Sequence, residues 1–386
     1  MLILNLSTNK IFHRVSAAVI LILSAIVVSC RSLPPAPGIG AEVSWSTLPG
    51  WLADSPAQAW PALQQSCQKM PARDARWKSI CDDAAFFTNP DDETARAFFE
   101  TRFVAREIIG RDNKTQGLIT GYYEPLLRGS LTRSARYRYP VYGRPDNLVT
   151  VDLGELYPEL KGKRLRGRLN GQRVVPYYSR AEIAKGKRPP DSAVLLWVDD
   201  PVELFFLEVQ GSGRVQLADG RTLLLGYADQ NGHPYVAIGR TLVEAGVFKL
   251  EEATMPAIRD WLLAHPEQAQ TVLNSNPSYV FFNVRAPSAP DPIGALDVPL
   301  SPERSVAVDP SFIPLGSPLW LDTNLPDNET KPYQRLVFAQ DSGGAIKGPA
   351  RADLFLGFGA KAERLAGAMR QPGKLYVLQP RAREIN

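Results

Sequence analysis

The chain is poor in cysteine and histidine, with three of each among its 386 residues. His13 lies near the N-terminus, and His233 and His265 stand apart from each other and from any cysteine. A zinc site needs a cluster of such side chains, and a Ser–His–Asp or Cys–His nucleophile needs a histidine that meets its partner. We therefore expect no metal, no other cofactor and neither kind of nucleophilic site.

The sequence also lacks a large excess of charge of one sign. Lysine and arginine number 44, and aspartate and glutamate number 40. The segment up to Ser29 contains Lys10 and Arg14 and no acidic residue, so its removal leaves 42 basic against 40 acidic residues and a formal charge of +2. A chain this close to neutrality gives no reason to expect a nucleic-acid partner.

The N-terminal segment has the pattern of a signal peptide. Two basic residues are followed by an apolar run from Val15 to Val28, which is too short for a comfortable transmembrane helix. The run ends in Val-Val-Ser-Cys30, which resembles the lipobox of bacterial lipoproteins, and Arg31 rather than aspartate follows. In such lipoproteins the cysteine is lipidated, and the absence of aspartate after it implies the outer membrane.

We therefore predict a lipoprotein signal peptide at residues 1–29. The lipidated Cys30 would begin a Pro/Gly-rich tether, residues 30–44. The predicted location is the outer membrane, facing the periplasm. The alternative is an ordinary signal peptide that happens to precede a cysteine.

Cys67 and Cys81 are the cysteines that remain, 14 positions apart. The first lies in a helical pattern and the second in the connection that follows. In an exported chain, such a pair forms a disulfide more often than two free thiols. Closing a loop of about 15 residues would stabilise the fold by roughly 3 kcal/mol.

Apolar patterns in the rest of the chain predict a mainly β protein with some α-helix. Helical spacing is found at 61–70, 91–110 and 242–265. Short apolar runs between turn residues predict a β-barrel or sandwich rather than βαβ units. The second helical range would turn Ala95, Phe98, Phe99 and Phe103 toward a core. The predicted strands are 117–123, 139–142, 194–198, 204–209, 221–227, 280–284, 304–308, 319–322, 335–339 and 375–378.

The stretch Gln340-Asp-Ser-Gly-Gly-Ala-Ile-Lys-Gly348 carries the clearest chemical signal. It places Asp341 at the end of a predicted strand, where apolar surroundings would raise the pKa of its carboxyl group. The glycines after it would let a bulky polymer approach the backbone. A carboxylic acid that stays protonated near neutral pH can protonate a glycosidic oxygen. The alternatives are an aspartate that caps a tight turn, or a carboxylate paired with Lys347 whose pKa is lowered.

Four motifs occur in an order that resembles the membrane-bound lytic murein transglycosylase A family. They are Gly-Tyr-Tyr-Glu-Pro at 121–125, Phe-Leu-Glu-Val-Gln-Gly-Ser-Gly at 206–213, Asn-Pro-Ser-Tyr-Val-Phe-Phe at 276–282 and the Asp341 stretch. Asp309 and Asp353 also fit that family. The resemblance covers nearly all of the chain after the tether.

The resemblance implies a double-psi β-barrel domain with an inserted smaller β domain and a groove between them. The barrel would comprise residues 45–136 plus 275–386, and the insertion residues 137–274. The implied partners are peptidoglycan glycan strands, the outer membrane through the lipid anchor, and a cell-wall enzyme complex.

The family's reaction cleaves the β-1,4 bond between N-acetylmuramic acid (MurNAc) and N-acetylglucosamine (GlcNAc) and leaves 1,6-anhydro-MurNAc. The C6 hydroxyl of the sugar is the nucleophile, so no second carboxylate is needed to activate water. The resemblance assigns the acid and base roles to Asp341.

Further residues are expected to bind substrate or support Asp341, although each has a structural alternative. Asp309 and Asp353 would hold Asp341 protonated by repulsion, or would cap turns. Tyr122 and its neighbours would contact sugar, or belong to the core. The polar turn after strand 204–209 would lie against the glycan, or be a plain hairpin. The remaining expected residues are Ser342, Gly343, Gly344, Gln210, Gly211, Ser212, Gly213, Tyr123 and Glu124.

Two other functional classes remain open from the sequence. One is a hydrolase on the same fold, in which Asp309 or Asp353 activates water. The other is a non-catalytic cell-wall-binding lipoprotein. A calcium site built from the three aspartates has no further support, because nothing else resembles a calcium loop.

Overall fold

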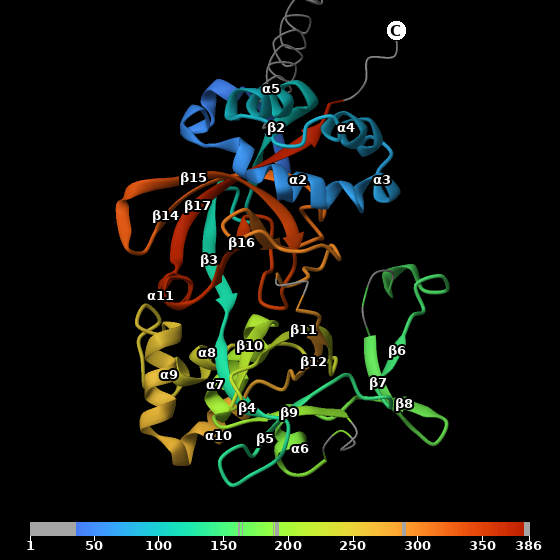
Figure 1. Ribbon diagram of the computed structural model, residues 1–386, viewed down its shortest axis with the longest axis vertical. Helices are drawn as coiled ribbons and strands as arrows, with labels where there is room; N and C mark the ends of the chain where they lie inside the picture. Colours follow the sequence, from blue (N-terminus) through green and yellow to red (C-terminus); the bar gives the residue numbers. More distant parts are fainter. Residues whose placement is uncertain are drawn as a thin grey trace, which may run out of the picture. The chain divides into compact units, whose positions relative to one another are not determined.

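The computed structural model describes residues 36–160, 163, 165–187, 189, 193–287 and 291–381 (Figure 1). The chain divides into two compact units, Met1–Ala36 and Pro37–Asn386, and all the described helices and strands belong to the second unit. The predicted signal peptide, Cys30 and the first part of the tether lie outside the described residues. None of the described helices is long and apolar enough to span a membrane.

An eight-stranded sheet has the order β1-β2-β17-β14-β15-β13-β16-β3, and β3 also pairs with β17. That additional pairing joins β17, β14, β15, β13, β16 and β3 into a closed circuit, which leaves no free edge in these strands. The strands are β1 Gly38–Val43, β2 Phe103–Ile109, β3 Gln116–Glu124, β13 Ser305–Val308, β14 Pro318–Leu325, β15 Asn328–Asp341, β16 Arg351–Phe358 and β17 Arg370–Pro380.

Short helices near the start of the second unit pack against β14 and β15. Their aromatic side chains form one core cluster with Trp320, Leu336 and Phe338 of these strands. These elements are η1 Trp45–Thr47, η2 Trp51–Ala53, η3 Pro56–Ala59, α2 Trp60–Cys67, α3 Met70–Arg73, α4 Trp77–Ala84 and α5 Asp92–Arg102.

The helix predicted at 91–110 is wrong in its second half. Asp91 caps α5 by accepting from Thr94, and the helix ends at Arg102. Residues Phe103–Ile109 form β2 instead, between β1 and β17. Its β-branched residues suit a strand, and pairing on both sides overrides the helical spacing. The predicted core residues Ala95, Phe98, Phe99 and Phe103 are all buried.

A six-stranded sheet has the order β12-β11-β10-β4-β9-β5, and the chain enters it as β3 passes into β4 through Pro125 (Figure 1). Its strands are β4 Leu126–Ser130, β5 Tyr139–Tyr142, β9 Val194–Val198, β10 Gly213–Leu217, β11 Thr222–Gln230 and β12 Val280–Arg285. A three-stranded sheet contains β6 Val149–Val151, β7 Leu165–Asn170 and β8 Arg173–Val175. The remaining elements are η4 Pro158–Leu160, α6 Arg180–Ala184, α7 Pro201–Gln210, α8 Ile238–Glu244, α9 Met255–Ala264, α10 Pro266–Asn274 and α11 Ala360–Ala368.

The strand predicted at 204–209 is wrong, because these residues lie in α7. Asp200 accepts hydrogen bonds from Val202 and Glu203 and so caps the helix, and Gly211 ends it in the left-handed conformation with φ 79°. The residues Val202 and Leu204–Glu208 are all buried. A helix buried on most of its faces has no polar stripe, so its apolar run resembles a buried strand.

The prediction of a mainly β protein with some helix is confirmed. A disulfide joins Cys67 of α2 to Cys81, with their Cα atoms 5.4 Å apart. Cys81 lies within α4 and not in a connection, which corrects its predicted placement. The insertion at residues 137–274 stays a prediction. Two strands of the six-stranded sheet, β4 and β12, lie outside these residues.

Candidate active site

Asp341 is the last residue of β15, and strand register brings it near Asp353. Ala307 of β13 pairs with Asp341 on one side and with Asp353 of β16 on the other. Asp353 in turn pairs with Thr120 of β3. Neighbouring strands lie about 4.8 Å apart, so the Cα atoms of the two aspartates are about 10 Å apart.

Three hydrogen bonds fix the carboxyl group of Asp341. The main-chain N–H groups of Ala295 and Ser342 donate to Oδ1 at 2.9 and 2.8 Å. The Tyr122 hydroxyl donates to Oδ2 at 2.9 Å. The side chain is therefore held in one orientation by a neighbouring loop, its own turn and β3.

Gly294 allows Ala295 to reach Asp341. A Cβ atom on Gly294 would lie 2.4 Å from the carbonyl oxygen of Gln340, closer than any side chain can approach. The N–H of Leu296 donates to that same oxygen at 3.0 Å. The segment 294–296 thus runs directly along the end of β15, which a residue larger than glycine would prevent.

Gln340 anchors the end of β15 in the core. Its side chain is fully buried; Oε1 accepts from Ser305 at 2.6 Å, and Nε2 donates to Ala62 and Ser66 of α2 at 2.8 and 3.0 Å. Successive residues of a strand face opposite sides, so this anchor turns Asp341 away from α2.

Burial raises the pKa of the Asp341 carboxyl group above its usual value, and the nearby Asp353 contributes in the same direction. The hydrogen bonds from Ser342, Tyr122 and Ala295 oppose this rise without cancelling it. Burial likewise raises the pKa of Asp353, against the opposing effects of Arg351 and Thr120. Asp341 therefore keeps its proton to a higher pH than an exposed aspartate does.

A second chain of contacts holds Asp353. The Thr120 hydroxyl donates to Oδ1 of Asp353, and Arg351 donates to the Thr120 hydroxyl oxygen at 2.8 Å. Thr120 and Tyr122 are two apart in β3 and so share a face. One strand thus supplies a hydroxyl to each aspartate.

Asp309 has a different environment from the other two aspartates. It lies 4% exposed after β13, where it accepts from the N–H groups of Gly348 at 2.8 Å and Ser311 at 3.1 Å. Burial raises its pKa, but these hydrogen bonds and the charge of Lys347 outweigh burial, so the pKa is lowered. Asp309 therefore fixes Gly348, at the C-terminal end of the loop that follows Asp341.

The loop after Asp341 lies close to the segment between β11 and α8. Ser342 and Gly343 are half-buried and Gly344 is exposed. A Cβ atom on Gly344 would lie 3.5 Å from Cβ of Tyr235. Further along, Ile346 is buried in a small cluster that includes Tyr122.

The other residues expected to bind substrate lie where β3 leaves the closed circuit. Oε1 of Gln210 accepts from the N–H of Tyr123 at 3.0 Å, which joins the end of α7 to β3. Glu124 is 1% exposed and forms ion pairs with Arg285 of β12 and, at 3.2 Å, with Arg214 of β10. The residues Gly211, Ser212 and Gly213 lead from α7 into β10.

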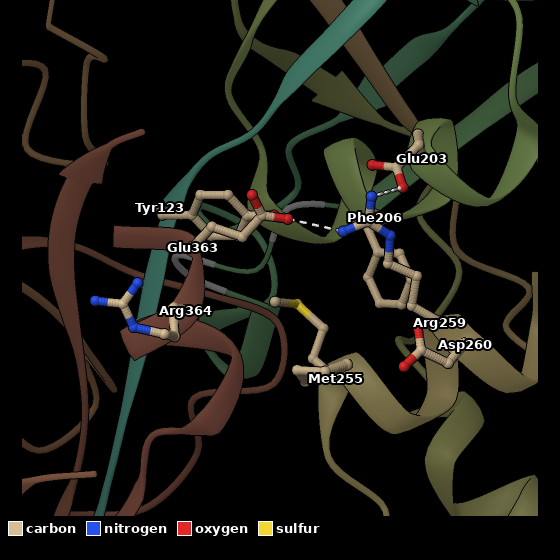
Figure 2. A pocket seen from close by; sticks show the side chains of 9 residues that line it. Tyr123, Glu203, Phe206, Met255, Arg259, Asp260, Glu363 and Arg364 are labelled. Atoms are coloured by element: carbon tan, nitrogen blue, oxygen red, sulfur yellow. Dashed lines mark hydrogen bonds and ion pairs between the residues drawn. The ribbon is translucent and has the colours of Figure 1, made fainter. Parts of the chain in front are cut away.

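Tyr123 lines a cavity of about 120 Å³ between α7, α9, α11 and β3 (Figure 2). Arg259 of α9 crosses it and binds Glu203 of α7 at 2.5 Å and Glu363 of α11 at 2.7 Å. Burial and then the charge of Glu363 raise the pKa of Tyr123 above its usual value. The lining includes neither Asp341 nor Asp353, so the structure separates Tyr123 from the two aspartates.

Sequence reasoning missed three contacts of this site. Ala295 carries no signal in the sequence, because its role depends on a main-chain N–H. Tyr122 was expected to contact sugar, and Thr120 was not considered. Both could have been found from their two-residue spacing in β3. Within the described part of the chain, no group of three or more histidine, cysteine, aspartate or glutamate residues is placed to hold a metal ion.

Comparisons with known proteins all indicate one family. The family model described as the MltA specific insert domain matches residues 118–283, and the model described as the 3D domain matches residues 304–379. The membrane-bound lytic murein transglycosylase A of Escherichia coli (strain K12) is 36% identical over 282 residues, which cover 71% of this chain and 69% of that protein.

Solved structures agree with these matches. The crystal structure of MltA from Neisseria gonorrhoeae, in its monoclinic form, is 34% identical with a TM-score of 0.75, and the match covers 91% of this chain and 97% of that one. The structure of E. coli MltA with bound chitohexaose is 28% identical with a TM-score of 0.67, covering 91% and 96%. The chain therefore belongs to the membrane-bound lytic murein transglycosylase A family.

Proposed function

We propose that this protein is a lytic transglycosylase that cleaves the β-1,4 bond between MurNAc and GlcNAc in peptidoglycan and forms 1,6-anhydro-MurNAc. The observation that carries the proposal is the Asp341 carboxyl group, which is held by three hydrogen bonds and whose pKa is raised by burial. The names of its relatives supply the substrate, and one of them was solved with chitohexaose bound.

In the proposed reaction Asp341 acts first as an acid and then as a base. Its proton passes to the oxygen that links the two sugars, and the bond from that oxygen to C1 of MurNAc breaks. The C6 hydroxyl of the same MurNAc then attacks C1 and returns a proton to Asp341. Because the nucleophile is tethered within the substrate, its effective concentration is high.

We also propose the double-psi barrel and inserted domain, at residues 45–136 plus 275–386 and 137–274, with the glycan in a groove between them. The closed circuit of six strands supports a barrel. The chain enters the six-stranded sheet once, from β3 to β4, and leaves it once, after β12, which supports an insertion. Of the expected substrate-binding residues, those on the loop after Asp341 are the best placed to contact a glycan, because Gly344 of this loop is exposed.

The test is the Asp341→Asn variant, assayed on purified peptidoglycan by mass spectrometry of the products. Loss of the proton donor should lower the rate by at least about 10²–10⁴-fold. Asp219→Asn is the matched control, because Asp219 lies in an exposed turn and pairs with Arg221. Retained activity in Asp341→Asn would mean that another group is the acid.

A hydrolase is the second candidate, and Asp353 is the observation that favours it. It is another carboxyl group two strands from Asp341, and its charged form could activate water, although its raised pKa lowers the share of that form. Cleavage in ¹⁸O water separates the two reactions. We expect unlabelled 1,6-anhydro ends, whereas label in most new ends would establish hydrolysis.

A further inference from the structure

The two oxygens of the Asp341 carboxyl group have different kinds of partner. Oδ1 accepts from two main-chain N–H groups, those of Ala295 at 2.9 Å and Ser342 at 2.8 Å. An N–H group can only donate, so a proton on Oδ1 would face two donors and no acceptor. Oδ2 meets only the Tyr122 hydroxyl among the described side chains, at 2.9 Å. The proton of Asp341 therefore belongs on Oδ2.

We propose that Tyr122 is a positioning residue for the acid–base step. Its hydrogen bond fixes the orientation of Oδ2, the oxygen left to carry the proton, and it stabilises the carboxylate that remains when this proton leaves. This inference rests on the proposed role of Asp341. Tyr122 acts through Asp341 and needs no contact with the glycan.

The surroundings of Tyr122 suit a fixed donor. It is 7% exposed, and its ring packs on Phe355 with a centroid distance of 5.2 Å. Burial holds the pKa of the Tyr122 hydroxyl well above its usual value, and Asp341 and Asp353 add to the rise. The hydroxyl therefore keeps its proton over the whole range in which Asp341 titrates.

Asp353 is the charged side chain that acts on the pKa of Asp341, and the other nearby groups face Asp353. Asp353 of β16 raises the pKa of Asp341 through its charge. Asp353 is itself faced by Arg351 of the same strand, by the Thr120 hydroxyl of β3, and by Tyr235, whose pKa it helps to raise. Tyr122 is thus the side chain that opposes the raised pKa of Asp341 by direct contact.

The step balances without a further reactant. The proton on Oδ2 passes to the bridging oxygen, which also takes the electron pair of the broken bond to C1. The C6 oxygen forms the new bond to C1, and its proton returns to Oδ2. Tyr122 keeps its own proton throughout and strengthens its hydrogen bond while Oδ2 is charged.

The Tyr122→Phe variant tests this role through the pH dependence of kcat/KM. Losing a donor to the carboxylate raises the pKa of Asp341, so activity should persist to a higher pH than in the wild type. The rate at the optimum should fall by about 10- to 100-fold, because the charged carboxylate loses its partner. Phenylalanine keeps the ring that packs on Phe355.

Tyr333→Phe is the matched control. Tyr333 also lies in a strand of the closed circuit, and its hydroxyl donates to a carboxylate, that of Glu303, at 3.2 Å. We expect its pH profile to match the wild type. A Tyr122→Phe profile whose alkaline limb does not move would overturn the inference, even with a lowered rate. If the alkaline limb of Tyr122→Phe does not move and Asp341→Asn is inactive in the same assay, only the role of Tyr122 is rejected. If Asp341→Asn is active, the proposed function is rejected.

Discussion

Burial raises the pKa of the Asp341 carboxyl group because it makes the charged form costly in the folded protein. Its folded pKa lies above the ordinary value of 3.8. A group of this kind contributes stability that is fully present below the unfolded pKa and is lost as the pH rises through the folded pKa. Near neutral pH, the deprotonated fraction of Asp341 therefore weakens the fold.

We predict that Asp341→Asn is more stable than the wild type at pH 7, although we expect it to be inactive. Asparagine carries no charge, and its carbonyl oxygen can still accept from Ala295 and Ser342. Thermal unfolding at pH 7 and pH 4 checks this, and the advantage should shrink at the lower pH, where Asp341 is protonated. An advantage of the same size at both pH values would contradict this electrostatic origin.

At the scale of single residues, the sequence predicted that Asp341 lies at the end of a strand, because a strongly apolar run ends just before it. The partners of its carboxyl group could be foreseen only in part. Tyr122 follows from strand periodicity, whereas Ala295 depends on the close approach that Gly294 allows after folding. The opposite pKa shifts of Asp309 and Asp341 depend on which N–H groups point at each one, and no sequence pattern encodes that.

Among the elements, α2 and α4 are short, with eight residues each, and a disulfide joins them. Helices of this length are marginal on their own in water. They depend on the disulfide and on the aromatic core that contains Trp60 and Trp77. Gln340 is anchored on α2, so this support extends to the end of β15.

Replacing Cys67 and Cys81 together by serine should lower the free energy of unfolding by about 3 kcal/mol. The reason is that the open chain has more conformations to lose on folding. Urea unfolding monitored by tryptophan fluorescence measures the change. Wild-type protein under reducing conditions should unfold like the variant, and a variant with unchanged stability would show that the disulfide is not needed.

Element prediction succeeded where a strand is a short apolar run between turn residues, and β5 and β9 have the predicted bounds. It failed at β16, where the polar residues Arg351 and Asp353 interrupt the apolar pattern at the site itself. It failed at α7 because burial on most faces removed the polar stripe of a surface helix.

At the scale of the whole molecule, the sequence could not indicate which distant strands pair. β3 pairs with β16 and β17, which follow it by more than 200 residues, and the pairing depends on tertiary contacts. The resemblance to a family predicted a barrel topology that periodicity could not indicate. Glu124 and Arg285, at the ends of β3 and β12, form a buried ion pair that joins the two strands by which the chain enters and leaves the six-stranded sheet.

Lipidation at Cys30 remains a prediction. The full-length protein should fractionate with the outer membrane and show an acyl mass shift, and Cys30→Ala should lose both, because the acyl chains supply the membrane affinity. Membrane fractionation with mass spectrometry of the N-terminal peptide measures this. A Cys30→Ala protein still in the outer membrane, with no acyl group on the wild type, would contradict it.

The pairing of β17 with β2, β3 and β14 also makes the closed circuit depend on a strand that is synthesised after Asp341 and Asp353. The circuit that carries Asp341 and Asp353 cannot close until residues 370–380 are available, near the end of the chain. Contacts so distant in sequence form late in folding. A chain that stops before residue 370 would therefore contain Asp341 and Asp353 without the strand that closes the circuit around them.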